Sequence, residues 1–91
     1  MKINDIKNRI VNSRKALGYR QKDVAEKSNN LLKQYSISKQ EKGDAYPSLE
    51  YLDFLSIKGV DINWILTGEG RMFKKQRRMN GADSLLLRAV G

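Results

Sequence analysis

The chain of 91 residues contains no cysteine and no histidine. Without cysteine it can form neither a disulfide nor a thiolate metal site, and without histidine it lacks the commonest general base and metal ligand. Its carboxylates are scattered over predicted helix surfaces, and no glycine-rich phosphate loop follows a strand. These absences argue against an enzyme, so we expect no catalytic residue, no metal site and no cofactor.

Long apolar runs are also missing from the chain. No stretch approaches the roughly 18 consecutive apolar residues of a membrane span, and the polar start, MKINDIKNR, lacks the apolar stretch of a signal peptide. The length suits one small domain with a single core. We therefore expect a soluble cytoplasmic protein with no membrane partner.

Acidic residues are scarce, with 10 Asp and Glu against 18 Lys and Arg, which gives a net charge of +8. The excess lies at the ends, because residues 1–20 and 71–91 each hold six basic residues and one acidic residue. Such an excess favours a polyanionic partner, either nucleic acid or an anionic membrane surface. Charge alone does not choose between them, and basic residues that only solvate the surface give the same count.

Apolar residues at helical spacing predict three helices in the first half of the chain. The expected spans are about Asn4 to Leu17, then 21–27, and about Leu32 to Lys42. Gly18 should end the first of these helices, and Asn30 or its neighbour should cap the third. Polar residues after position 27 separate the second helix from the third.

Two further helices are predicted in the second half. Pro47 can open a fourth that runs up to Gly59, and Asp61 can cap a fifth, INWIL, that stops at Gly68. The apolar face of the fourth helix would consist of Leu49, Leu52 and Leu55. No segment alternates with the period of a strand, so we expect an all-α fold with a compact domain over residues 1–70.

A series of positions between about residues 9 and 73 follows a fixed order. They are Arg14, Leu17-Gly18, Gln21, Ala25, Ile37-Ser38, Glu41, Gly43, Pro47-Ser48-Leu49, Gly59-Val60, Trp64 and Leu66-Thr67-Gly68. In this order they resemble the lambda-repressor/Cro (Xre-type) helix-turn-helix family, and DINWILTGEGRMF resembles the N-terminal domains of phage repressors. The resemblance implies a compact five-helix DNA-binding domain whose third helix lies in the major groove.

The resemblance also implies which residues read bases. Gln34 matches the family glutamine at the front of the recognition helix, and its amide can pair with N6 and N7 of adenine. Lys33, Tyr35 and Ser38 occupy neighbouring exposed faces, where they could read a guanine, touch a thymine methyl or bind a phosphate. The alternative is that Gln34 only solvates the helix.

A second group of residues is expected at phosphates. Gln21 matches the family glutamine that opens the second helix and contacts a phosphate. Arg20 stands where the family commonly has a Ser or Thr cap, and since Arg cannot accept from free amides it could lie near phosphate instead. Lys39, Lys42 and Tyr46 look like residues that clamp the DNA backbone.

Other matched positions are expected to be structural. Arg14 and Glu41 match a family ion pair that links the first helix to the end of the third. The expected core residues are Ala25, Ile37, Leu52 and Trp64. Besides Arg20, two departures from the family pattern stand out: about two residues are added in SNNLL, and Gln40 replaces the apolar or aromatic residue usual before the glutamate. The face around Gln40 should therefore be either less buried or hydrogen-bonded.

Residues 71–91 form a basic tail, partly helical or disordered, most of which lies outside the resemblance. Lys74, Lys75, Arg77 and Arg78 could form a flexible arm that adds phosphate contacts, or belong to a linker that makes none. The stretch from Leu85 to Val90 could be a dimerising helix or the stump of a connection to a further domain.

The sequence thus predicts a sequence-specific transcriptional regulator, a phage-type repressor that binds double-stranded DNA at a palindromic operator as a homodimer. Such a protein would be associated with the nucleoid of a bacterial cell. An antitoxin, which binds its operator and covers a partner toxin with its tail, is one alternative. A small RNA-binding protein is another, although the aromatic pairs used for base stacking are absent.

Overall fold

The computed structural model describes residues 2–74. The five elements within this range are all helices: α1 (Ile3–Ala16), α2 (Gln21–Lys27), α3 (Gln34–Lys42), α4 (Leu49–Ile57) and α5 (Ile62–Thr67). The β-type pairing in this range is a single isolated bridge between Val60 and Phe73. The prediction of an all-α fold is therefore confirmed for the described part of the chain.

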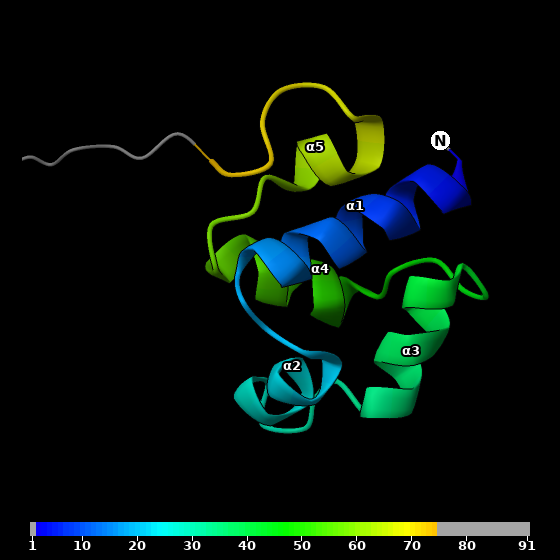
Figure 1. Cartoon of the computed structure of the whole chain (residues 1–91), viewed down its shortest axis with the longest axis vertical. Helices are drawn as coiled ribbons and strands as arrows, with labels where there is room; N and C mark the ends of the chain where they lie inside the picture. The colour runs from blue at the N-terminus through cyan, green and yellow to red at the C-terminus, as the bar shows by residue number, and fades with distance from the viewer. Residues whose placement is uncertain (1, 75–91) are drawn as a thin grey trace, which may run out of the picture.

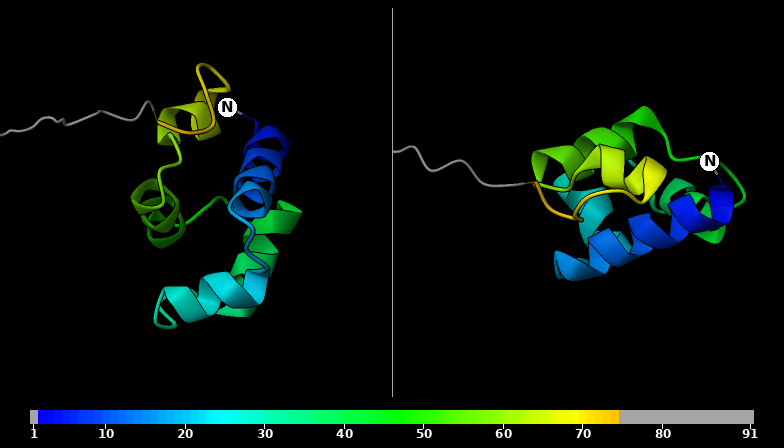
Figure 2. Two further views of the ribbon diagram at one scale, coloured as in Figure 1. Left: turned by 60° about the vertical axis from the view of Figure 1, so that its left-hand side comes forward. Right: turned by 90° about the horizontal axis from the view of Figure 1, so that it is seen from above.

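Helix α1 crosses the middle of the view in Figure 1, with α5 above it and with α2 and α3 below it. The view from above in Figure 2 places α4 behind α1. At the lower edge of Figure 1 and of the left view of Figure 2, α2 lies against the beginning of α3. Within residues 2–74, no helix is long and apolar enough to cross a membrane.

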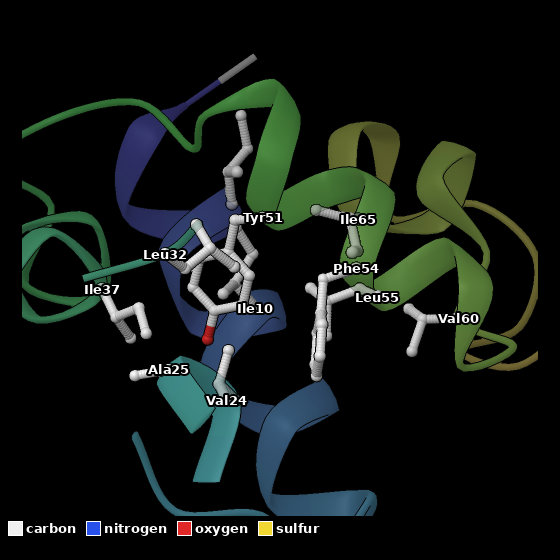
Figure 3. Packing of buried hydrophobic residues seen from close by; sticks show 11 residues of the cluster. Ile10, Val24, Ala25, Leu32, Ile37, Tyr51, Phe54, Leu55, Val60 and Ile65 are labelled. Carbon is white, nitrogen blue, oxygen red and sulfur yellow. The ribbon is translucent and has the colours of Figure 1, made fainter. Parts of the chain in front are cut away.

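A single apolar core joins the helices (Figure 3). Its members are Ile6, Ile10, Val24, Ala25, Leu32, Ile37, Tyr51, Phe54, Leu55, Val60 and Ile65. Each large aliphatic side chain buried in this way stabilises the fold by about 1.5–3 kcal/mol. Ala25 and Ile37 were expected in the core and are buried, whereas Leu52 and Trp64 are partly buried and pack against it.

The segment between α2 and α3 differs from the prediction. Asn29 and Asn30 adopt left-handed backbone angles, with φ of 56° and 64°, which Asn tolerates better than most residues. Ser28 Oγ then accepts from the Leu32 amide at 3.2 Å, and the Leu32 side chain enters the core. The third helix therefore starts at Gln34 rather than at Leu32, and the prediction that Asn30 caps it is wrong.

The start of α4 also differs from the prediction. The helix begins at Leu49 rather than at Pro47, because Ser48 Oγ accepts from the Tyr51 amide and caps it. Leu49 was expected on the apolar face but is 81% exposed. The buried face consists of Tyr51, Phe54 and Leu55, a set at the i, i+3, i+4 spacing of one helix side.

Candidate nucleic-acid interface

Helix α3 has two chemically different faces. Ile37, Gln40 and Glu41 are buried against the other helices. The exposed or partly exposed side chains are those of Gln34, Tyr35, Ser38, Lys39 and Lys42. Since residues four apart are neighbours on a helix, Gln34, Ser38 and Lys42 form one row and Tyr35 and Lys39 form the next. A continuous surface of amide, hydroxyl and ammonium groups therefore runs along the outside of α3.

The four expected base readers all lie at the front of this surface. Lys33 occupies the N-cap position, where its side chain makes no capping bond. Gln34 and Tyr35 are the first two residues of α3, and the Tyr35 side chain is 71% exposed. Ser38 follows one turn later and is partly exposed. The structure thus brings Lys33, Gln34, Tyr35 and Ser38 together at one end of one helix.

Three of the expected phosphate-binding residues follow at the back of the surface. Lys39 and Lys42 lie in the last turn of α3, and Tyr46 lies in the loop after it with 61% of its side chain exposed. Two ammonium groups near the carboxyl end of a helix also complement its dipole, so they favour the helix itself. Their exposure leaves both ammonium groups accessible to a polyanion.

Arg20 and Gln21, at the start of α2, are engaged within the protein. The Arg20 guanidinium donates to Asp23 from Nε at 3.2 Å and from Nη2 at 3.1 Å, and the Arg20 amide donates at 2.8 Å. These bonds lower the pKa of Asp23 to about 2. Gln21 Nε2 donates to Glu41 Oε1 at 3.1 Å. The roles of both residues at a phosphate remain predictions.

The Glu41 carboxylate is the centre of a buried polar cluster. Arg14 donates to it from Nε and Nη2, at 2.8 and 3.0 Å, and the side chains of the pair are 11% and 4% exposed. Tyr51 Oη donates to the same carboxylate, as does Gln21. The remaining Arg14 nitrogen, Nη1, donates to the Tyr19 carbonyl at 2.8 Å. This cluster contains the ion pair that the resemblance implies, and it ties α1, α2 and α4 to the last turn of α3.

Burial and hydrogen bonding set the ionisation of this cluster. The hydrogen bond with Glu41 raises the pKa of Arg14 above its usual value, against the opposing effect of burial. Burial, followed by the hydrogen bond to Glu41, raises the pKa of the Tyr51 phenol far above its usual range. The phenol therefore stays protonated and donates near neutral pH, and the guanidinium stays charged, so both donors to Glu41 are retained.

Sequence reasoning left the role of Gln40 open and missed that of Tyr51. Gln40 is 4% exposed; its Nε2 donates to Ser36 Oγ at 3.0 Å and its Oε1 accepts from the Ser48 amide at 2.8 Å. The hydrogen-bonded alternative is therefore the one observed. Gln40 holds the residue that caps α4, and Tyr51 in the first turn of α4 reaches Glu41. Ser48, as the cap of α4, was a local signal that Tyr51 lies in the first turn of that helix. The partner of Tyr51, Glu41, lies on another helix and could not be found from this signal.

Arg9 was also missed by the sequence analysis. Its Nη1 donates to the Ile65 carbonyl at 2.9 Å, across 56 positions of sequence. The guanidinium also lies against Gly68, the left-handed residue at which α5 ends. A cation at the carboxyl end of a helix is stabilising, so one of the basic residues of the N-terminal segment is structural.

Of the predicted arm residues in the tail, Lys74 lies within the described range. Lys74 Nζ donates to the carbonyl and to the hydroxyl of Ser56, at 3.0 and 2.8 Å. The other predicted arm residues, Lys75, Arg77 and Arg78, and the stretch from Leu85 to Val90, lie outside the described residues. Between residues 2 and 74, no group of three His, Cys, Asp or Glu side chains could hold a metal ion.

Comparisons of the chain with models of protein families, with curated proteins and with solved structures find no match. Membership of the lambda-repressor/Cro family therefore remains a proposal, which rests on the residues quoted above. The structural support for a function comes from the surface of α3 and the buried cluster behind it.

Proposed function

We propose that the protein is a sequence-specific DNA-binding transcriptional regulator of the lambda-repressor/Cro type. In this proposal α2 and α3 form the helix-turn-helix and α3 enters the major groove. The observation that carries the proposal is the two-faced character of α3. Its inner face is buried with Ile37 and Glu41, while its outer face is polar and basic along its whole length.

The position of α3 supports insertion into a groove. The helix lies at the edge of the domain, and α2 lies across its beginning (Figures 1 and 2). The major groove of B-DNA is about 12 Å wide and accepts one helix with its side chains. Gln34, the first residue of α3, would reach a base edge, and its amide supplies the donor and the acceptor that adenine requires.

The cations around the outer face would hold the phosphates. Lys39 and Lys42 lie on α3 itself, and Lys33 precedes its first turn. Contacts of this kind fix the register of a protein on DNA without reading sequence, and their formation releases counterions. Affinity should accordingly fall steeply as salt is added.

Rigidity behind α3 supports readout of bases rather than loose attachment. The Arg14 pair and the Tyr51 hydroxyl hold Glu41, and Gln40 holds the loop that follows α3. A recognition helix must be held firmly if its side chains are to keep hydrogen-bonding geometry with bases. In this proposal two copies bind a palindromic operator, with half-sites about one helical turn apart.

A selection of duplexes from a random pool by the purified chain tests this function. We expect enrichment of one half-site, repeated with inverted orientation. A pool in which no sequence is enriched would contradict sequence-specific binding. Competition of the selected duplex by an RNA hairpin of equal length would support the RNA-binding alternative instead. Lys58→Gln is the charge-matched control for removal of a lysine from α3. It also removes one positive charge, but Lys58 follows the last turn of α4 and is not part of α3.

A further inference from the structure

A groove of about 260 Å³ lies between the turn that follows α2 and the outer side of α4. Residues 27–29, 31 and 32 form one wall, and Glu50, Asp53 and Ile57 line the other. The elements that form both walls lie to the left of α3 in Figure 1. No residue of α3 lines the groove, so its lining does not overlap the exposed row of α3 that forms the proposed DNA interface.

The edges of this groove are apolar and exposed. Leu31 is 76% exposed on one wall and Ile57 is 73% exposed on the other, and Phe54 of α4 also lines the groove. Leu31 projects there because the SNNLL turn is closed by the left-handed backbone of Asn29 and Asn30. Large aliphatic side chains gathered at one hollow are typical of a surface that another segment covers.

The charges along the groove favour a basic occupant. Neither Glu50 nor Asp53 forms an ion pair within residues 2–74. The two lysines of the groove stand over aromatic rings instead, Lys27 at 5.1 Å from the centre of Tyr19 and Lys58 at 5.7 Å from that of Phe54. Two carboxylates beside two apolar side chains would suit a segment in which leucines are followed by a basic residue.

We propose that the occupant is residues 85–90 of the same chain, LLLRAV. The leucines of this segment would cover Leu31 and Ile57, and Arg88 would pair with the carboxylates of α4. Residues 85–90 lie outside the described part of the chain, so the assignment comes from their chemistry and from where the described chain ends.

The described chain ends beside the groove. The Lys74 amide donates to the Gly59 carbonyl, and Lys74 Nζ is bound to Ser56, which directly precedes Ile57. Only residues 75–84 separate this anchor from Leu85. Such a connection can span roughly 35 Å when extended. It gives an effective concentration on the order of millimolar, at which a weak contact within one chain is occupied.

A single nitroxide label tests the docking, because the full chain has no native cysteine. We would place the label at Ser84→Cys and record amide signals of the isotope-labelled chain without DNA. We expect a strong loss of intensity at Leu31 and Ile57 and full intensity at Tyr35 and Lys39. Undiminished signals at the groove, or equal losses over the whole domain, would overturn the proposal.

Two controls separate the sources of the signal loss. Ile57→Asp removes an apolar contact of the docked segment, so in the labelled chain it should restore the Leu31 signal. Because Ile57 is exposed, this change should not unfold the domain. The second control mixes isotope-labelled chains that carry no nitroxide with nitroxide-labelled chains of natural isotopic abundance. Full intensity in that mixture supports docking within one chain. Losses at the groove in the mixture would place the segment on a second copy and overturn same-chain docking.

Discussion

Arg14 of α1 binds the carboxylate of Glu41 of α3 through two hydrogen bonds, from Nε at 2.8 Å and from Nη2 at 3.0 Å. Paired guanidinium and carboxylate groups of this kind fix a relative orientation as well as a distance. Because Glu41 is in the last turn of α3, the pair sets how the opposite, polar face of α3 is presented. The buried cluster and the proposed DNA interface are therefore the two faces of one helix.

Removal of the Glu41 carboxylate should strongly destabilise the domain. Glu41→Leu leaves the buried Arg14 guanidinium without a counter-ion, and a change of this kind costs about 3–5 kcal/mol. The double variant Arg14→Met with Glu41→Leu should recover part of that loss, because no unpaired charge remains. Urea denaturation of the single and double variants measures both effects. Additive losses would show that the two side chains are not coupled.

The exposed pair Arg20 and Asp23 is the matched control for that experiment. The Arg20 side chain is 76% exposed, so solvent and salt screen its interaction with Asp23. Arg20→Ala should leave the urea midpoint nearly unchanged, whereas Glu41→Leu lowers it. A similar loss from both variants would contradict the special role of the buried pair.

Stability should fall at alkaline pH because of Tyr51. Burial raises the pKa of Tyr51 above its ordinary value of 10.0. Above that pH the unfolded chain releases the phenol proton while the folded chain keeps it, so the free energy of unfolding decreases as pH rises. In Tyr51→Phe the free energy of unfolding should therefore decrease less between neutral pH and pH values above 10. Urea denaturation at several pH values measures this difference.

Tyr51→Phe should also lower stability at neutral pH by about 1–2 kcal/mol, through loss of the hydrogen bond to a charged acceptor. Tyr46→Phe is the matched control, since Tyr46 is 61% exposed. It should change neither the neutral stability nor the alkaline decrease. An alkaline decrease that is identical with and without the Tyr51 hydroxyl would disprove this explanation.

Substitutions at the two ends of α3 should affect DNA binding differently. Gln34→Ala should relax the preference at one operator position, a loss of discrimination of about 1–3 kcal/mol. Lys39→Ala should instead weaken binding to all duplexes alike and reduce the salt slope by about 1. Fluorescence anisotropy with the selected duplex and single-base variants, at several salt concentrations, separates the two. Equal loss on all sequences for Gln34→Ala would exclude base readout by Gln34.

Two glycines with the same backbone angle should respond differently to alanine. Gly18 and Gly68 both have φ of +80°, but an added Cβ has no neighbour within 4 Å at Gly18 and meets Arg9 Nη2 at 2.6 Å at Gly68. Both variants carry the left-handed strain of about 1–2 kcal/mol. Gly68→Ala should lower the free energy of unfolding by about 1 kcal/mol more than Gly18→Ala, because the Arg9 guanidinium must give up its hydrogen bond to the Ile65 carbonyl. Equal thermal shifts of the two variants would rule out a role for Arg9 at this position.

Local pattern was enough for the class of fold and for several helix ends. Gly18 and Gly68 follow helices, as expected. Asp61 caps α5 through the Asn63 amide. These signals are readable in sequence because a cap or a terminating glycine acts within one turn of chain. The polar residues at the front of α3 were instead identified through the family resemblance, which no cap or terminating glycine supplies.

What the sequence alone determined is therefore the all-α class, the approximate order of five helices and the candidate residues of α3. The tertiary structure decided that Tyr51 rather than Leu49 faces the core, that Leu31 and Leu32 separate into exposed and buried, and that Gln40 and Arg9 hold other segments. Each of these depends on a partner far away in sequence. Periodicity defines the faces of a helix, but only the packed neighbours decide which face is buried and which polar groups find partners.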